Sequence, residues 1–325
     1  MTVFLIRRLT QSFVVLIIMS LLVFVGVFAI GNPIDILISP DATQQEIERA
    51  TAALGLDKPL WEQYWIFLVN AAHGDLGRSF VFNEPAVGII LQRLPATLEL
   101  ALVAMLLTVV IGVPLGLWAG LKPDAFSGKT IMAGSILGFS LPTFWVGLML
   151  IMLFAVELKV LPSNGRGATA EFLFIRSSLF TRDGWAHVAM PATNLALVNI
   201  ALVIRLIRAG VREALLMDYV KFARAKGLGM RRVILVHVMK NIMIPVVTVL
   251  GLEFGSLIAF AVVTETIFAW PGMGKLIIDS INLLDRPVIV AYLMLTVFLV
   301  TLINLLVDIT YSVIDPRIRL AEPDA

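Results

Sequence analysis

The sequence contains no cysteine and only three histidines, and Asp, Glu, Lys and Arg together make up 15% of its 325 residues. The absence of cysteine excludes disulfides, thiolate metal sites and cysteine nucleophiles. His73, His187 and His237 are far apart in the sequence, so a cluster of histidine metal ligands is not expected. Because 59% of the residues are hydrophobic, the chain is too apolar for an ordinary soluble domain, and we predict a polytopic membrane protein.

Two catalytic motifs are also missing. No Gly-x-x-x-x-Gly-Lys-Ser/Thr sequence occurs, and the nearest match, at 272–275, has no strand before it, so the chain is not expected to hydrolyse ATP itself. Ser140 follows Gly138-Phe, but the glycine that would come after a nucleophilic serine is absent, and no membrane-embedded histidine is expected to activate it. These absences disfavour a membrane enzyme.

Six largely uncharged runs are long enough to cross a hydrocarbon core of about 30 Å at about 1.5 Å per residue. We therefore predict an all-α fold with six transmembrane helices. The first run is expected to remain as a span, because it exceeds the ~7–15 apolar residues of a signal peptide. The predicted spans are 9–30, 100–121, 130–156, 186–204, 242–264 and 287–307.

Other features of the runs bear on packing and topology. Gly112 and Gly116 have the spacing of a close helix contact. Prolines at 114, 142 and 191 lie inside or at the ends of runs, where neighbouring groups must satisfy the freed carbonyls. The more polar stretch 31–92 shows helical periodicity at 45–54 and 60–69 and is predicted to be a small folded domain outside the membrane.

The distribution of positive charge predicts which side faces the cytoplasm. Six spans place both termini on one side, and that side holds fifteen of the 25 Lys and Arg residues, nine of them in 205–240. By the positive-inside rule, both termini and the 205–240 loop are cytoplasmic.

This basic loop contains a predicted short helix. Asp218 can cap its start, Gly227 can end it, and Lys226 lies near the negative end of its dipole. A longer helix is also possible, with an apolar face of Val211, Leu215, Tyr219, Phe222 and Ala223. Such an element could lie on anionic lipid, or it could dock on a protein, since Ala223 and Ala225 permit close approach.

The residues Asp218-Tyr-Val and Ala223-Arg-Ala-Lys-Gly227 resemble the cytoplasmic coupling loop of bacterial ABC importer permeases, in the dipeptide, oligopeptide and nickel branch. Further motifs of this family occur in the same order along the chain. They are Arg-Leu-Pro-Ala-Thr-Leu-Glu-Leu-Ala at 93–101, Gly-Phe-Ser-Leu-Pro-Thr-Phe-Trp-Val-Gly at 138–147, Leu-Pro-Ser-Asn-Gly at 161–165, the stretch 187–191, Glu-Thr-Ile-Phe-Ala-Trp-Pro-Gly-Met-Gly at 265–274 and Asp-Pro-Arg at 315–317.

The resemblance implies a type I ABC importer transmembrane fold in the bacterial inner membrane. It implies a transmembrane helix at 1–30, an extracytoplasmic region at 31–93, a permease core at 94–312 with a coupling loop at 210–241, and a cytoplasmic tail at 313–325. The coupling helix would dock in a cleft of an ATP-binding subunit through Asp218, Tyr219, Phe222, Ala223, Arg224, Ala225, Lys226 and Gly227.

The same resemblance implies the partners and the cargo. The partners would be a second homologous permease, two ATP-binding subunits, a periplasmic or lipid-anchored solute-binding protein and membrane lipids. Nucleic acid is not expected. No cofactor would bind this chain, because ATP and Mg would be used by the partner subunits. The expected cargo is a di- or oligopeptide, with nickel, glutathione or oligosaccharide as alternatives. An ion-driven secondary transporter is the rival from another class, but there is one mid-span acid and no internal repeat.

That mid-span acid is Glu253, whose burial in lipid as an anion would cost roughly 2.5 kcal/mol or more. It must therefore face the bundle interior, a polar or cationic partner, or the translocation path. The stretch from Glu265 to the turn at 270–274 either caps the fifth span or forms an outer gate. The candidate path and gate residues are Ser140, Asn199, Glu253, Glu265 and Trp270.

The predicted topology can be tested with two reporter fusions. A reporter fused after Lys226 should report a cytoplasmic location, and one fused near Asp57 should report an external location, because the charge asymmetry places them on opposite sides. Reporters on the same side would rule out the six-span arrangement.

Overall fold

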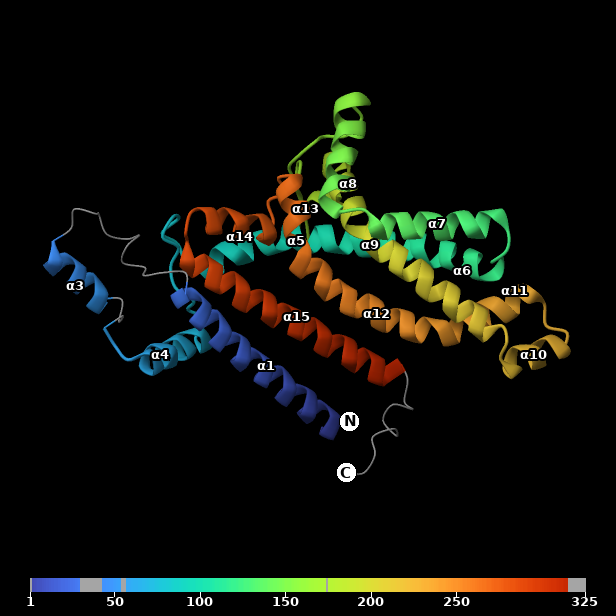
Figure 1. Ribbon diagram of the computed structural model, residues 1–325, viewed down its shortest axis with the longest axis horizontal. Coiled ribbons are helices and arrows are strands. Elements are labelled where there is room, and N and C mark those ends of the chain that lie inside the picture. Colours follow the sequence, from blue (N-terminus) through green and yellow to red (C-terminus); the bar gives the residue numbers. More distant parts are fainter. Residues whose placement is uncertain (1, 30–42, 54–56, 174, 315–325) are drawn as a thin grey trace.

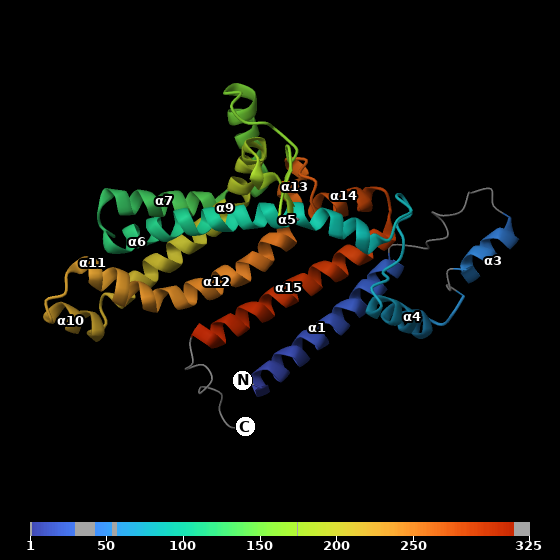
Figure 2. The ribbon, with the colours of Figure 1, turned by 180° about the vertical axis from the view of Figure 1, so that it is seen from behind.

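The computed structural model describes residues 2–29, 43–53, 57–173 and 175–314 and is almost entirely helical in this part of the chain. Long helices lie side by side along one axis, and a shorter segment projects sideways from them (Figures 1 and 2). The helices are α1 (Thr2–Ala29), α3 (Gln44–Ala53), α4 (Leu60–Ala72), α5 (Ala86–Leu107), α6 (Val113–Leu121), α7 (Phe126–Ser140), α8 (Thr143–Leu150), α9 (Arg182–Ala214), α10 (Asp218–Ala225), α11 (Met230–Arg232), α12 (Met239–Phe260), α13 (Val262–Ile267), α14 (Met273–Asn282) and α15 (Arg286–Ile314).

Shorter elements connect these helices. Three wide π-helical turns are η1 (Thr108–Gly112), η2 (Ile151–Glu157) and η4 (Val233–Val238), and one 3₁₀ turn is η3 (Ser178–Phe180). The strands β1 (Ala170–Phe172) and β2 (Ile175–Ser177) form an antiparallel pair in which Glu171 lies opposite Arg176. This pair belongs to the loop between η2 and α9.

Five helical segments among the described residues are long and apolar enough to cross a membrane, and the bent pair of α7 with α8–η2 is a sixth candidate. This agrees with the prediction of six spans. The five segments are Ile6–Gly26, Ala86–Leu121, Arg182–Ala214, Met230–Phe260 and Arg286–Thr310. The α6–α7 connection and α10 lie at one end of the molecule, and the start of α1 and the end of α15 are the ends of those helices that point toward it (Figures 1 and 2).

The boundaries of several predicted spans were wrong. The second helix begins at Ala86 rather than 100, and α9 extends ten residues past the predicted end at 204, to Ala214. The fifth span ends at Phe260, and Thr264 belongs to the separate helix α13. In each case, charged or polar residues that were taken as limits are accommodated within helical structure.

The third predicted span, 130–156, is not a straight helix. Its two halves, Phe126–Ser140 and Thr143–Glu157, meet at an angle of 105°. Pro142 precedes the second half and lacks the N–H that a continuous helix would use, and its ring disfavours helical geometry at the residue before it. The second half, α8, therefore projects away from the long helices (Figure 1).

The stretch 31–92 does not form the predicted folded domain in its described part. The two predicted helices are present as α3 and α4, but α4 has no buried residue. It packs on the outer end of α1 through Tyr64, whose hydroxyl lies 2.8 Å from that of Ser20, and through a ring contact with Phe24. The rest of this prediction, at 31–42 and 54–56, lies outside the described residues.

Proline 114 is accommodated by a change of helix type. It lies in the first turn of α6, directly after the π-helical turn η1. Since proline offers no N–H to the preceding turn, a local π-helical adjustment lets the span continue without unsatisfied carbonyls in the membrane. Pro191, in contrast, lies inside the continuous helix α9.

The glycine contact predicted at Gly112 and Gly116 is present and extends one turn further. A Cβ atom at Gly116 would lie 2.9 Å from the Cβ of Ile207, and one at Gly120 would lie 2.7 Å from the Cβ of Val211. Helix α6 thus touches α9 with its backbone. We call Gly112, Gly116 and Gly120 the glycine seam.

Helix α1 is fixed to α15 near their shared end. Arg8 forms an ion pair with Asp308 at 3.2 Å. An ion pair is one way to satisfy two charges that lie close to the hydrocarbon region. This contact attaches the first span to the last.

The glycine seam generates a stability prediction. Gly116→Ala should lower the free energy of unfolding by about 1–3 kcal/mol, because the new methyl group overlaps Ile207 and the carbonyl oxygen of Ile204. Thermal unfolding of the purified transporter measures the change. Gly134→Ala in α7 is the matched control, since nothing lies within 4 Å of its Cβ position. Equal melting temperatures for the two variants would contradict a packed seam.

Candidate coupling helix and translocation path

The predicted short basic helix is present as α10, and its end has a defined hydrogen-bond pattern. Gly227 has φ +77°, its N–H donates to the carbonyl of Arg224, and the N–H of Leu228 donates to the carbonyl of Ala223. This pair of bonds is a Schellman motif, in which glycine is favoured because the left-handed conformation strains other residues. The sequence therefore predicted the helix end correctly.

The start of α10 differs from the prediction. Met217, not Asp218, occupies the capping position, and its side chain makes no capping hydrogen bond. Asp218 is the first helical residue and forms an exposed ion pair with Lys221 at 2.9 Å. The longer alternative helix is excluded, because α9 ends at Ala214 and the chain turns before α10.

One face of α10 is buried against the rest of the chain, and the other face is exposed. Val220 and Ala223 are buried in a cluster with Val211 of α9, Val233 of η4 and Ile242 of α12. The sequence argument that Ala223 contacts another protein is therefore wrong, since Ala223 fixes α10 to its own chain and is 5% exposed.

The outward face of α10 is aromatic and basic. Phe222 is 62% exposed and Tyr219 is 38% exposed. The ammonium group of Lys226 lies 4.6 Å from the centroid of the Phe222 ring. Arg224 and Ala225 are exposed on the same short helix.

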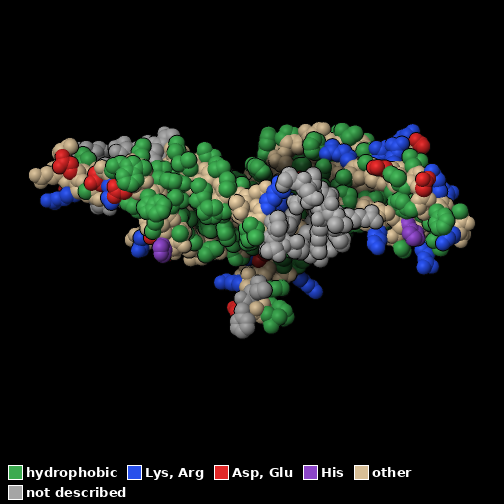
Figure 3. Space-filling view, turned by 90° about the horizontal axis from the view of Figure 1, so that it is seen from below, with side chains coloured by type: hydrophobic (Ala, Val, Ile, Leu, Met, Phe, Trp, Pro, Cys, Tyr) green, Lys and Arg blue, Asp and Glu red, His purple; other side chains and the backbone are tan. Residues whose placement is uncertain are grey.

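Basic side chains surround α10. Figure 3 shows hydrophobic side chains over the middle of the molecule and Lys and Arg side chains gathered toward the end that carries α10 and α11. The exposed basic residues of this region are Lys221, Arg224, Lys226, Arg231, Arg232 and Lys240.

At the opposite end, Glu265 and Trp270 lie inside a polar cluster. Both side chains have 0% exposure. The hydroxyl of Thr97 donates to Glu265 at 2.6 Å, and the N–H of Lys275 donates to its other oxygen at 3.0 Å. The indole N–H of Trp270 donates to the carbonyl of Ala96 at 2.8 Å.

Burial raises the pKa of Glu265, and the hydrogen bonds from Thr97 and from the backbone of Lys275 and Gly274 oppose this rise. The hydroxyl of Thr97, in α5, also accepts a hydrogen bond from the N–H of Met273 at 2.8 Å. Glu265 thus joins α5 to the segment after α13. This geometry supports the interpretation that Glu265 and the 270–274 turn cap the fifth span, while their role as a gate stays a prediction.

A second acid of α5 holds the loop before α9. Glu99 accepts hydrogen bonds from the Nε of Arg166 at 2.9 Å and from the hydroxyl of Ser178 at 2.8 Å, and a second guanidinium nitrogen completes a bidentate pair. Such two-point pairs fix both position and orientation. We call Thr97, Glu99, Arg166, Ser178, Glu265 and Trp270 the outer polar cluster. Arg166 could not be singled out from the sequence, because its partner Glu99 lies 67 positions away.

The remaining predicted path residues have different surroundings. Asn199 is buried at 5% exposure. Ser140 is exposed and bonds to the carbonyl of Ile136 in its own helix. Glu253 is half-buried, and no hydrogen bond or ion pair of its side chain is found within the described residues. The structure does not bring these three residues into one site.

A charged residue near Ser140 was missed. Arg205 lies within α9, and its guanidinium carbon is 4.3 Å from the centroid of the Phe139 ring. The sequence prediction assigned Arg205 to the cytoplasmic loop, because hydropathy ends the apolar run at 204. A helical period continued to Ala214 would have placed it inside the helix.

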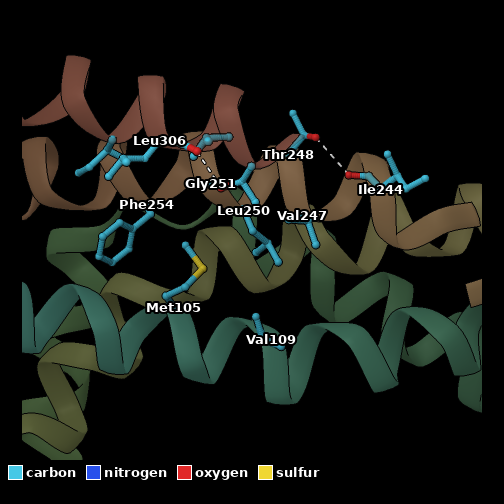
Figure 4. Close-up of a pocket in the computed structure, with 12 residues that line it drawn as sticks. Met105, Val109, Ile244, Val247, Thr248, Leu250, Gly251, Phe254 and Leu306 are labelled. Atoms are coloured by element: carbon cyan, nitrogen blue, oxygen red, sulfur yellow. Dashed lines mark hydrogen bonds between the residues drawn. The ribbon is translucent and has the colours of Figure 1, made fainter. Parts of the chain in front are cut away.

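A groove of about 420 Å³ lies between α5–η1, α12 and α15 (Figure 4). Its lining is apolar apart from backbone and two threonines. Thr248 donates to the carbonyl of Ile244 at 3.1 Å, and Thr310 donates to that of Leu306 at 2.7 Å. Glu253 is not part of this lining. The groove thus offers no free polar side chain for a charged or peptide cargo.

A bundle of apolar spans with a basic helix fixed at one end is the architecture of a multi-pass membrane protein. Residues 112–320 match the family described as "Binding-protein-dependent transport system inner membrane component", and residues 1–101 match the N-terminal region of the same group of proteins. The chain therefore belongs to this family of bacterial inner-membrane ABC importer permeases, in which separate subunits carry the ATPase.

Two curated relatives are similar over nearly their whole length. The chain is 39% identical to the dipeptide transport system permease protein DppB of Escherichia coli (strain K12), over 97% of this chain and 98% of that protein. It is 37% identical to the glutathione transport system permease protein GsiC of the same organism, with the same coverage of both chains.

Solved structures support the type I importer fold. An inward-facing structure of the MetNI methionine ABC transporter aligns with a TM-score of 0.54 and 16% identity, covering 70% of this chain and 96% of that chain. At this identity, the similarity concerns the fold alone.

The outer polar cluster generates a prediction that separates a structural role from a gating role. Glu265→Gln should lower the free energy of unfolding by about 1–3 kcal/mol, because its amide nitrogen would face the N–H of Lys275 in a buried site. Thermal unfolding measures the loss, and Glu171→Gln on exposed β1 is the control. Unchanged stability combined with altered cargo selectivity would instead support a gate.

Proposed function

We propose that this chain forms the translocation path for short peptides together with a second homologous permease. Its further partners are two ATP-binding subunits, which use ATP and Mg, and an extracytoplasmic solute-binding protein. This chain itself binds no cofactor. The cytoplasmic position of α10 and of both termini belongs to the same proposal.

The cargo class is supported by the relatives. Their names specify a dipeptide and glutathione, and glutathione is itself a short peptide. Nickel and oligosaccharide remain the alternatives raised by the wider family. The half-buried Glu253 supports a path for a charged cargo, because an acid within a span is expected to face water or a partner.

The observation that carries the coupling role is the division of α10 into two faces. Val220 and Ala223 fix the helix to α9, η4 and α12, while Tyr219 and Phe222 remain exposed. Exposed aromatic side chains beside basic ones are typical of protein interface hot spots. A helix fixed in this way can transmit the movement of a docked ATP-binding subunit to the spans.

The docking surface therefore lies on the Tyr219 and Phe222 face, not at Ala223. Phe222→Ala should weaken the association with the ATP-binding subunit by about 2 kcal/mol, since a buried phenylalanine at an interface contributes roughly 1.5–3 kcal/mol. The whole transporter, reconstituted in proteoliposomes, should lose most ATP-dependent uptake of labelled alanylalanine.

Phe126→Ala is the matched control, because Phe126 is 87% exposed at the start of α7 toward the same end of the molecule. Uptake by the Phe222 variant equal to that of this control would remove α10 as the docking element. Uptake of nickel or an oligosaccharide, but not of alanylalanine or glutathione, would reject the peptide cargo.

A further inference from the structure

Arg205 is a positive charge well inside the apolar part of the bundle. Phe139, the ring beneath it, lies about 20 Å along α7 from Phe126, at about 1.5 Å per residue. The hydroxyl of Ser135 contacts the carbonyl of Ala201, one turn before Arg205, and Ala201 lies about 20 Å from the end of α9 at Ala214. Both helices thus place the guanidinium far from their shared end.

The side chain of Arg205 also points away from that end. Side chains of a helix tilt toward its N-terminus, and the N-terminus of α9 is the end that carries the outer polar cluster. The guanidinium accordingly rests on Phe139 instead of extending toward Ala214. A lipid phosphate at the membrane surface is therefore not its natural ligand.

Within the described residues, Arg205 has no acidic partner. The ion pairs of the described chain involve other residues, and its contact with Phe139 leaves the N–H edge of the guanidinium available. Stacking on an aromatic ring orients a guanidinium but does not neutralise its charge.

The surroundings of Phe139 are open. Phe139 is 52% exposed, Leu141 is 38% exposed, and nothing lies within 4 Å of the Cβ position of Gly138. A charge of this depth is costly against lipid, so this face is expected to meet a water-filled path or a polar partner. The 105° bend of the third span starts at the next residues.

Two more arginines follow on the same face of α9 toward α10. Arg208 is half-buried, and its Nε has no hydrogen-bond partner in the described residues. Arg212 is exposed one turn further. The spacing of three and four residues places all three on one side of the helix.

We propose that Arg205, held on Phe139 at the bend of the third span, binds the carboxylate of the peptide as it passes along the translocation path. This inference rests on the proposed function, and it adds the chemical group that is recognised. A guanidinium offers two parallel N–H donors that match both oxygens of a carboxylate. Arg208 follows one turn further along the same face of α9, toward the exit of the path.

The test uses the absence of cysteine in the chain. Gly138→Cys introduces a thiol beside Phe139, in a position with free space. In the reconstituted transporter, this thiol should react at least tenfold faster with a sulfonate-bearing methanethiosulfonate than with a trimethylammonium-bearing one. Adding Arg205→Gln should abolish this preference, whereas Arg205→Lys should retain most of it.

Cargo provides the second readout. Alanylalanine should slow labelling of the thiol, and its C-terminal amide should not, because the amide lacks the carboxylate. Arg205→Gln should remove the protection while leaving co-purification of the partner subunits unchanged. Arg212→Gln, on the exposed end of the same face, is the control and should preserve protection.

Each other outcome overturns the inference. A thiol that reacts with neither reagent faces lipid or packed protein. Equal protection by the acid and the amide means that Arg205 does not read the carboxylate, and loss of the second permease on Arg205→Gln means that it is an assembly contact. Import of alanylalanine without protection rejects this inference alone, whereas absence of any peptide import rejects the proposed function.

Discussion

The close contact between α6 and α9 along the glycine seam is the constraint on which the rest of the structure depends. Between helices in lipid, the hydrophobic effect supplies little attraction, so van der Waals packing of closely approaching backbones has to supply it. The seam ends where Gly120 meets Val211, and Val211 belongs to the cluster that buries Val220 and Ala223 of α10. The seam and α10 are therefore parts of one packed unit, and a displacement of α10 acts on α6 and α9 together.

The outer polar cluster joins separate segments into one unit at the opposite end of the bundle. One turn of α5 supplies Thr97 and Glu99. Thr97 bonds to Glu265, which follows α9 in the chain, and Glu99 accepts a bond from Ser178, which precedes α9. The bonds of Thr97 to Glu265, of Ser178 to Glu99 and of Trp270 to Ala96 are buried, where a lost partner costs more than at the surface. The outer ends of the second and fifth spans are thus expected to move as a rigid body, as alternating access by rigid rocking requires.

Local features of the fold were predictable from the sequence, and features that depend on distant partners were not. The Schellman end at Gly227 and the seam at Gly112 and Gly116 follow from a few neighbouring residues. In contrast, hydropathy started the second span only after Glu99, at residue 100, because it treats any charge as a limit. The helix continues there, since Arg166 and Ser178 satisfy the carboxylate.

The error at Ala223 has a different origin. Ala223 was assigned to the docking surface because its small side chain permits close approach, but a small side chain packs equally well against the chain's own helices. The longer helix drawn from Val211 placed Ala223 on one face with Tyr219 and Phe222, but the chain turns between Ala214 and Asp218, so Tyr219 and Phe222 are exposed and Ala223 is buried. Periodicity can assign faces only within one helix, and the position of the break depends on the packing of Val220 against α9 and η4.

Helix α9 joins the two ends of the molecule. Thr181 caps its start beside Ser178 of the outer polar cluster, and its last turns carry Val211 above α10. At 33 residues, it is about 50 Å long, longer than the hydrocarbon core of a bilayer. A continuous helix of this length connects the cluster around α10 with the depth of Arg205.

The third span is bent at Pro142, between α7 and α8. Helix α7 contacts α9 through Ser135 and Ala201, whereas α8 contacts the outer segment through Gly147 and Phe268. Gly147 of α8 also lies against Asn194 of α9, so the two halves of the third span meet α9 at different levels and are joined by a short break without helical hydrogen bonding at proline. Pro142 lies three residues after Phe139, the ring on which Arg205 rests. Under the proposals above, Arg205 on the path and α10 as the docking element are linked through the same helix, α9.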